Sequence, residues 1–181
     1  MNSILKNTKL YIAKRRWLGI LLQVLLVIIV FLAITSWQTR NATRGEAPSF
    51  SGQLINNNPV FLQNYRGKPL LLHFWATWCP VCKLEQNSIA RIANDSDDSY
   101  YQVLTVASWS GTASDVAKYM QQENLSFPVL VDDDGSIAKL YGVQGVPSSF
   151  VMNSNGFIQF VEQGYTTETG LRLRLWWLKN N

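Results

Sequence analysis

Hydrophobic and polar positions follow two different periods along the chain, and the combination predicts an α/β domain. Residues 67–77 and 101–108 are nearly continuous apolar runs, typical of strands that are buried on both faces. Residues 110–125 instead place Val116 and Met120 on one side of an amphipathic helix. Strands of this kind that alternate with helices indicate helices packed on a partly parallel sheet.

Turn-forming residues divide the remaining sequence into two predicted hairpins. Residues 48–55 and 58–65 flank an Asn- and Pro-rich turn and predict a short β-hairpin. Residues 146–164 predict a second hairpin, which turns at Asn155-Gly156.

Helices are expected on either side of these strands, and one of them is ambiguous. Pro80 is suited to the first position of a helix that runs to about Asn94. In the final segment, residues 166–181, leucines three and four apart fit a helix, whereas leucines two apart fit a strand. The sequence leaves both readings open.

The N-terminal part of the chain predicts a membrane anchor. Residues 17–37 contain no charged side chain, and 21 residues of helix span the roughly 30 Å core of a bilayer. Residues 1–16 carry five basic and no acidic side chains, which favours a cytoplasmic tail. A cleaved signal peptide is the alternative, but its apolar region is usually about 7 to 15 residues long. We expect an uncleaved signal anchor, a polar linker over residues 38–48 and one domain over residues 49–181.

The net charge of +4 gives no reason to expect a nucleic-acid partner. Five of the 16 Lys and Arg residues lie in the basic tail, so 11 remain against 12 acidic residues in the rest of the chain, a balance of −1. The net positive charge of the chain therefore comes from residues 1–16, the basic tail that is predicted to stay in the cytoplasm.

Cys79 and Cys82 are the only two cysteines, and their spacing leaves three interpretations. A structural disulfide across two intervening residues closes a very short loop and stabilises a fold little. Two thiolates could hold Cu(I), which prefers soft ligands. A reactive pair fits best, because Cys79 would lie at a helix N-terminus, where free N–H groups and the helix dipole stabilise a thiolate.

The stretch FWATWCPVCK, followed by GVQGVP, resembles the thioredoxin superfamily. Residues 48–178 resemble more narrowly its membrane-anchored TlpA-like and cytochrome c maturation branch, and most of all the suppressor-of-copper-sensitivity protein D type. The resemblance implies a thioredoxin-like fold, a mixed sheet flanked by helices, with an N-terminal hairpin and a strand-helix insertion. Peroxiredoxins carry a Pro-x-x-x-Thr-x-x-Cys pattern, but here Leu72 stands at the proline position and Thr77 is only two residues before Cys79.

The same resemblance assigns roles around the cysteines. It implies that Cys79 attacks a disulfide, that Cys82 resolves the mixed disulfide, and that Pro147 belongs to a cis-proline loop that docks the substrate backbone. The expected substrate contacts are Trp78, which would shield the disulfide, with Pro80, Val81 and Val146.

Two further residues have both a functional and a structural interpretation. Glu85 matches an acidic residue that tunes the buried cysteine in the TlpA-like branch, although a solvated helical glutamate is the alternative. His73 stands where many thioredoxins carry a buried Asp and the TlpA-like branch commonly an Asn. A neutral imidazole could accept the proton of Cys82, but a lone buried histidine is more often a hydrogen-bonded core residue.

The sequence thus predicts a membrane-anchored, periplasmic thiol-disulfide oxidoreductase. Its expected partners are protein thiols and disulfides and a membrane redox partner that resets the cysteines. The only redox group expected is the Cys79–Cys82 disulfide, with no separate cofactor and no metal, and we expect a monomer. A non-catalytic copper-binding or copper-handling protein that uses the same thiols is the alternative.

Overall fold

The chain divides into two compact units, residues 1–40 and 41–181. The computed structural model describes residues 17, 19–30, 42–96 and 100–179. In the first unit residues 19–30 are helical with exposed side chains. No helix of the described part of the chain is both long and apolar enough to cross a membrane. The span expected over residues 17–37 lies partly, and the basic tail over residues 1–16 wholly, outside the described residues.

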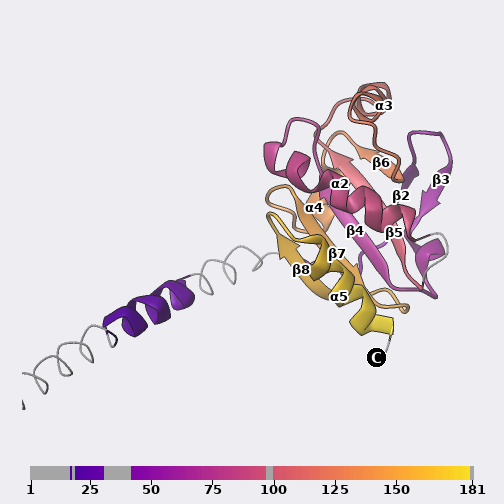
Figure 1. Ribbon diagram of the computed structural model, residues 1–181. Coiled ribbons are helices and arrows are strands. Elements are labelled where there is room, and N and C mark those ends of the chain that lie inside the picture. Colours follow the sequence, from indigo (N-terminus) through magenta and orange to yellow (C-terminus); the bar gives the residue numbers. More distant parts are fainter. Residues whose placement is uncertain (1–16, 18, 31–41, 97–99, 180–181) are drawn as a thin grey trace, which may run out of the picture. The chain divides into compact units, whose positions relative to one another are not determined.

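A six-stranded mixed sheet forms the centre of the second unit (Figure 1). In spatial order its strands are β1 (Gly45–Glu46), β8 (Phe157–Gln163), β7 (Ser148–Met152), β4 (Leu70–Trp75), β5 (Gln102–Ser108) and β6 (Val129–Asp132). The strands β4, β5 and β6 are parallel, whereas β7 and β8 form an antiparallel hairpin, and β1 pairs antiparallel with β8. The expected partly parallel sheet and the hairpin at Asn155-Gly156 are therefore confirmed.

Helices cover both faces of this sheet. They are α2 (Pro80–Asn94), α3 (Ala113–Gln122), α4 (Ser136–Leu140) and α5 (Glu168–Lys179). Figure 1 shows α2 and α5 lying across the same face. The ambiguous C-terminal segment is helical because Leu171 and Leu175 are fully buried while Leu173 is 61% exposed, a period of four rather than two. Each of the two buried leucines stabilises the fold by about 1.5 to 3 kcal/mol.

Two hydrophobic cores lie on opposite faces of the sheet, and alternation along β4 divides its side chains between them. Leu72 and Phe74 belong to one core, whereas Leu71 and Trp75 belong to the core beneath α2. Because successive side chains of a strand point to opposite faces, His73 shares the α2 side with Leu71 and Trp75.

The N-terminal segment of the domain differs from the expected linker. A short two-stranded sheet, β2 (Ser51–Gln53) and β3 (Pro59–Phe61), confirms the first hairpin, and the 3-10 helix η1 (Leu62–Tyr65) follows it. Residues 42–48, assigned to the linker from their polar composition, instead contribute β1 and the buried Ala47. Two residues of edge strand are too few to show a period, so no local pattern predicts this strand.

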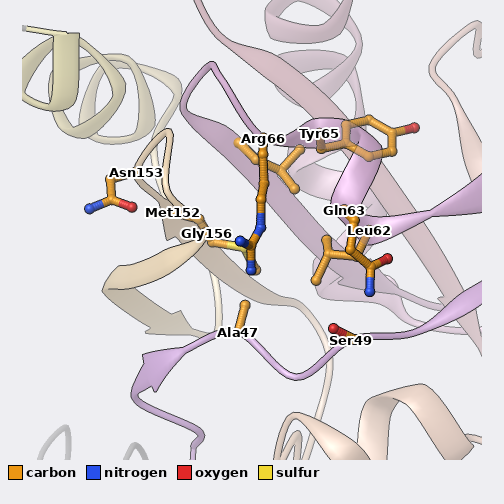
Figure 2. Close-up of a pocket in the computed structure, with 10 residues that line it drawn as sticks. Ala47, Ser49, Leu62, Gln63, Tyr65, Arg66, Met152, Asn153 and Gly156 are labelled. Atoms are coloured by element: carbon orange, nitrogen blue, oxygen red, sulfur yellow. The ribbon is translucent and has the colours of Figure 1, made fainter.

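A small pocket lies where this segment meets the sheet (Figure 2). Ala47, Arg66 and Gly156 are among the residues that line its roughly 10 Å³, and the Arg66 side chain reaches toward Ala47. Arg66 also pairs with Glu46 of β1 at 2.8 Å. The pocket has room for about one water molecule.

Candidate active site

Cys79 and Cys82 form a disulfide at the start of α2, directly after β4. Cys79 is the N-cap residue with an extended backbone, and Pro80 occupies the first helical position. The Cys82 backbone N–H donates a hydrogen bond to the Cys79 sulfur over 3.1 Å. The predicted helix N-terminus is confirmed, and it directs a backbone N–H group at the Cys79 sulfur.

A second segment brings a backbone carbonyl group to the same sulfur. The Val146-Pro147 peptide bond is cis, as expected from the resemblance. The Val146 carbonyl oxygen lies 3.5 Å from the Cys79 sulfur, while Pro147 itself is buried. The Pro147 carbonyl accepts a hydrogen bond from the Gly164 N–H over 2.8 Å. The loop therefore presents one main-chain carbonyl group, that of Val146, beside the disulfide.

Exposed apolar side chains occur close to the two cysteines along the chain. Trp78 is 62% exposed, and on α2 the side chains of Val81 and Leu84 are 38% and 72% exposed. The Trp78 indole N–H donates to the carbonyl oxygen of Trp109 over 2.8 Å. Trp78 and Val81 are among the predicted substrate contacts, whereas Trp109 was not predicted.

Trp109 is held in place by the segment that follows β6. Its φ of 51° lies in the left-handed region, which is uncommon for a residue other than glycine. Its backbone N–H donates to the Asp132 carbonyl oxygen over 3.1 Å, and a Cβ atom at Gly135 would overlap its indole ring. Only the absence of a side chain at Gly135 lets the indole lie there, so this position of Trp109 depends on Gly135.

Behind the disulfide, His73 and Glu85 meet in the interior. The His73 Nε2 atom is 3.5 Å from the Glu85 Oε1 atom, and the side chains are only 3% and 1% exposed. The Ser149 Oγ atom lies 2.9 Å from His73 Nδ1, and the Thr166 N–H donates to Glu85 Oε2 over 2.9 Å. Glu85 is therefore buried, and the alternative of a solvated helical glutamate does not hold.

Burial acts in opposite directions on these two groups. It lowers the pKa of His73 to about 3, because an imidazolium ion loses its hydration there. It raises the pKa of Glu85 to about 7, and the hydrogen bond from Thr166 partly opposes that rise. Near neutral pH the contact therefore joins a neutral imidazole to a carboxyl group that can gain or lose a proton, and it is not a pair of two ions.

Ser149 and Thr166 are site residues that sequence reasoning missed. Ser149 lies opposite His73 in the antiparallel pairing of β4 with β7. That register depends on the hairpin and on the sheet as a whole, and local patterns do not give it. The only available signal was that Ser149 follows Pro147 by two residues.

Within the described ranges, no three or more His, Cys, Asp or Glu side chains come together in a group that could hold a metal ion. The described site offers the chemistry of the two cysteine sulfurs and of the titratable Glu85 carboxyl group. A helix N-terminus favours a thiolate on Cys79, and a carboxyl group of near-neutral pKa lies one helical turn beyond Cys82.

Comparison with known proteins gives consistent matches over this domain. Residues 43–161 match the model of the AhpC/TSA family. The chain is 30% identical to a thioredoxin-like protein of Haemophilus influenzae over 155 residues, 85% of this chain and 90% of that protein. It is 29% identical to the thiol-disulfide oxidoreductase ResA of Bacillus subtilis over 164 residues, 86% of this chain and 90% of ResA.

A solved structure agrees with these relatives. The crystal structure of a secreted disulfide oxidoreductase of Mycobacterium tuberculosis, described as homologous to DsbE of E. coli, superposes with a TM-score of 0.61. The sequences are 25% identical, and the match covers 70% of this chain and 93% of the mycobacterial one.

Proposed function

This chain belongs to the AhpC/TSA family and is a thiol-disulfide oxidoreductase of the ResA/DsbE type, and we propose that it exchanges disulfides with proteins outside the cytoplasm. The observation that carries the proposal is the Cys79 sulfur, which caps α2 and lies beside the Val146 carbonyl group. We do not propose that the chain reduces peroxides, because Leu72 and Thr77 depart from the peroxiredoxin pattern.

The exchange proceeds in two sulfur displacements. In the reduced protein the Cys79 thiolate attacks one sulfur of a substrate disulfide, forms a mixed disulfide and releases the other sulfur as a thiolate. Cys82 then loses its proton and attacks the Cys79 sulfur, which releases the second substrate sulfur. Two electrons pass from the cysteine pair to the substrate, and the reverse sequence oxidises a dithiol.

The buried carboxyl group is suited to the second displacement. Glu85 lies three residues beyond Cys82 on α2, so its side chain is on the neighbouring turn of the same helix face. With a pKa raised to about 7, the Glu85 carboxylate can accept the Cys82 proton near neutral pH. His73 then acts through its contact with Glu85 rather than on Cys82 directly.

The outer surface is suited to a polypeptide substrate. Trp78 and Val81, which flank Cys79 and Pro80 in the sequence, offer exposed apolar surface, and the Val146 carbonyl group offers a main-chain acceptor beside the Cys79 sulfur. An extended peptide that carries a cysteine can use both at once. Cysteines of apocytochromes or of copper-tolerance proteins are the substrates that the TlpA-like resemblance suggests.

The location is part of the proposal. Residues 17–37 are long and apolar enough as a sequence to anchor the chain in the cytoplasmic membrane, with residues 49–181 in the periplasm. There a monomeric domain would work with a membrane redox partner that resets the cysteine pair. In spheroplasts, added protease should degrade the domain, whereas a domain protected until the membrane is dissolved would place it in the cytoplasm.

Catalysis tests the activity directly. The full chain in detergent micelles should accelerate the reduction of insulin disulfides by dithiothreitol, and Cys79→Ser and Cys82→Ser should both abolish the acceleration. No acceleration by the wild-type protein, or full activity in either variant, would contradict the proposed exchange. Nothing specific in the described structure favours the copper-handling alternative.

A further inference from the structure

Four polar groups from four segments form a buried row behind the cysteine pair. The Thr166 N–H, after β8, donates to Glu85 Oε2 on α2. Glu85 Oε1 faces His73 Nε2 on β4, and His73 Nδ1 faces the Ser149 hydroxyl on β7. The row thus ends in a hydroxyl group, which can both donate and accept a hydrogen bond.

Within this row Glu85 Oε1 depends on His73. The oxygen is fully buried, and it has no hydrogen-bond partner at ordinary distance, so His73 Nε2 at 3.5 Å is the polar atom that faces it. A carboxylate oxygen needs a donor, whereas a protonated carboxyl group needs an acceptor for its own hydrogen. His73 can satisfy both only if its ring proton moves from one nitrogen to the other.

We propose that Ser149 is a positioning residue that lets His73 exchange tautomers, so that Glu85 can gain or lose a proton in the interior with its contact satisfied in both states. The inference rests on the proposed function only for the origin of that proton, which is the Cys82 thiol. The exchange of tautomers itself requires no substrate.

The two states balance proton by proton. When Glu85 is a carboxylate, His73 Nε2–H donates to Oε1, and His73 Nδ1 accepts from the Ser149 hydroxyl. When Glu85 is protonated, its hydrogen is donated to the bare Nε2 atom, and Nδ1–H donates to the Ser149 oxygen, whose hydroxyl has rotated. The row gains one proton in total, and His73 remains neutral in both states.

The neighbouring charges do not provide another partner for this proton. Cys82 lies on the same helix as Glu85, and in the oxidised protein it does not titrate. On α5, which packs against α2, Glu168 is already paired with Arg91 and Arg172. The charged side chain next to the row on β8 is Glu162, which is paired with Arg174.

The chain offers a direct measurement, because His73 is its only histidine. In the oxidised full chain, labelled with ¹⁵N-histidine and held in detergent micelles, the two ring nitrogens report the tautomer. The Nε2–H form should dominate above about pH 7 and the Nδ1–H form below it, with no imidazolium down to about pH 5. An imidazolium signal near neutral pH, or one unchanged tautomer throughout, would overturn the proposal.

Variants at two adjacent serines show whether Ser149 determines the pH at which His73 exchanges tautomers. Ser149→Ala leaves Nδ1–H without an acceptor and should move the midpoint down by about one pH unit, and Ser149→Thr should restore it. Ser148→Ala is the matched control, since the Ser148 hydroxyl is also buried but donates to the Gly145 carbonyl oxygen. An unchanged midpoint in Ser149→Ala would remove Ser149 from the row.

The outcome is independent of the proposed enzymatic activity. The titration uses oxidised protein without substrate, so it can succeed even if insulin reduction fails. If Ser149→Ala does not fold, the wild-type titration alone still decides whether His73 exchanges tautomers.

Discussion

The two cysteines have the same side chain but different surroundings. Cys79 caps α2 and its sulfur accepts the Cys82 N–H, whereas Cys82 lies inside the first helical turn; both residues are buried, at 4% and 3% exposed. A thiolate at the N-cap position is stabilised by the free N–H groups and the dipole of the helix, and a thiolate inside the first turn lacks that position. The nucleophile and the resolving cysteine are therefore distinguished by environment, and the resolving cysteine needs a nearby proton acceptor.

Glu85→Gln should change how the stability of the fold depends on pH. The pKa of Glu85 in the fold, about 7, is above its ordinary value of 4.5, so its contribution is fully present below about pH 4.5 and is lost as the pH rises through 7. Wild type should lose up to about 3 kcal/mol relative to the non-titrating Gln variant over this range. Urea unfolding of both proteins at about pH 5 and pH 8 measures the difference.

Both proteins carry His73, whose own titration is therefore shared. Parallel stability changes in wild type and Glu85→Gln would show that Glu85 has an ordinary pKa in the fold.

His73→Ala should slow resolution more than attack. Without the imidazole, the proton of Cys82 must be accepted by a Glu85 carboxyl group that lacks its buried partner, so mixed disulfides should persist roughly tenfold longer at pH 7. His73→Asn is the matched control for packing and hydrogen bonding, because it retains a polar side chain without a titratable ring, and it should also slow resolution. Quenched-flow measurement of the mixed disulfide checks both, and wild-type lifetimes in the variants would return His73 to a structural role.

Among the elements, the end of β6 and the turn after it hold Trp109, the residue that follows β5, in place. The buried Asp132 carboxylate accepts from the Ser108 hydroxyl and from two N–H groups at the start of α4, those of Ile137 and Ala138. The Asp132 carbonyl oxygen also holds the Trp109 N–H. The end of β6 thus positions the tryptophan whose carbonyl group binds Trp78.

Gly135→Ala should therefore disturb the surface beside the disulfide. Gly135 and Gly67 both have positive φ, 68° and 95°, but an added Cβ overlaps the Trp109 indole only at Gly135 and meets open space at Gly67. Gly135→Ala should cost roughly 1 to 3 kcal/mol more than Gly67→Ala, because it adds overpacking to the same backbone strain. Urea unfolding measures both, and equal losses would mean that Trp109 moves aside freely.

The sequence predicted the elements best where one signal dominated. Pro80 and the polar run after Asn94 gave the bounds of α2, and the apolar run gave β4. The pairing of His73 with Ser149, and the burial of Glu85, depend on strand register and on helix packing. Such tertiary information is absent from local periodicity, so the sequence predicted the two cysteines but not the full row behind them.

At the scale of the whole molecule, residues 41–181 form a compact unit with two cores of their own. A chain that starts at Ala42 retains all of the described strands and both cores. It should be soluble, monomeric and as active on insulin as the full chain in micelles, as measured by light scattering and turnover. Insolubility or lost turnover would show that the N-terminal unit belongs to the working structure.

Asymmetric trapping in cells shows whether Cys79 leads thiol-disulfide exchange with partner proteins. Cys82→Ser leaves Cys79 able to attack but removes the sulfur that resolves the product, so covalent adducts with partner proteins should accumulate. Cys79→Ser leaves only the Cys82 thiol, which lies inside the helical turn and not at its N-cap, and should give far fewer adducts. We expect high-mass bands from Cys82→Ser that collapse on addition of dithiothreitol. A stoichiometric Cu(I) signal that either substitution abolishes equally, with no adducts from either variant, would contradict the account and favour a two-thiolate copper site.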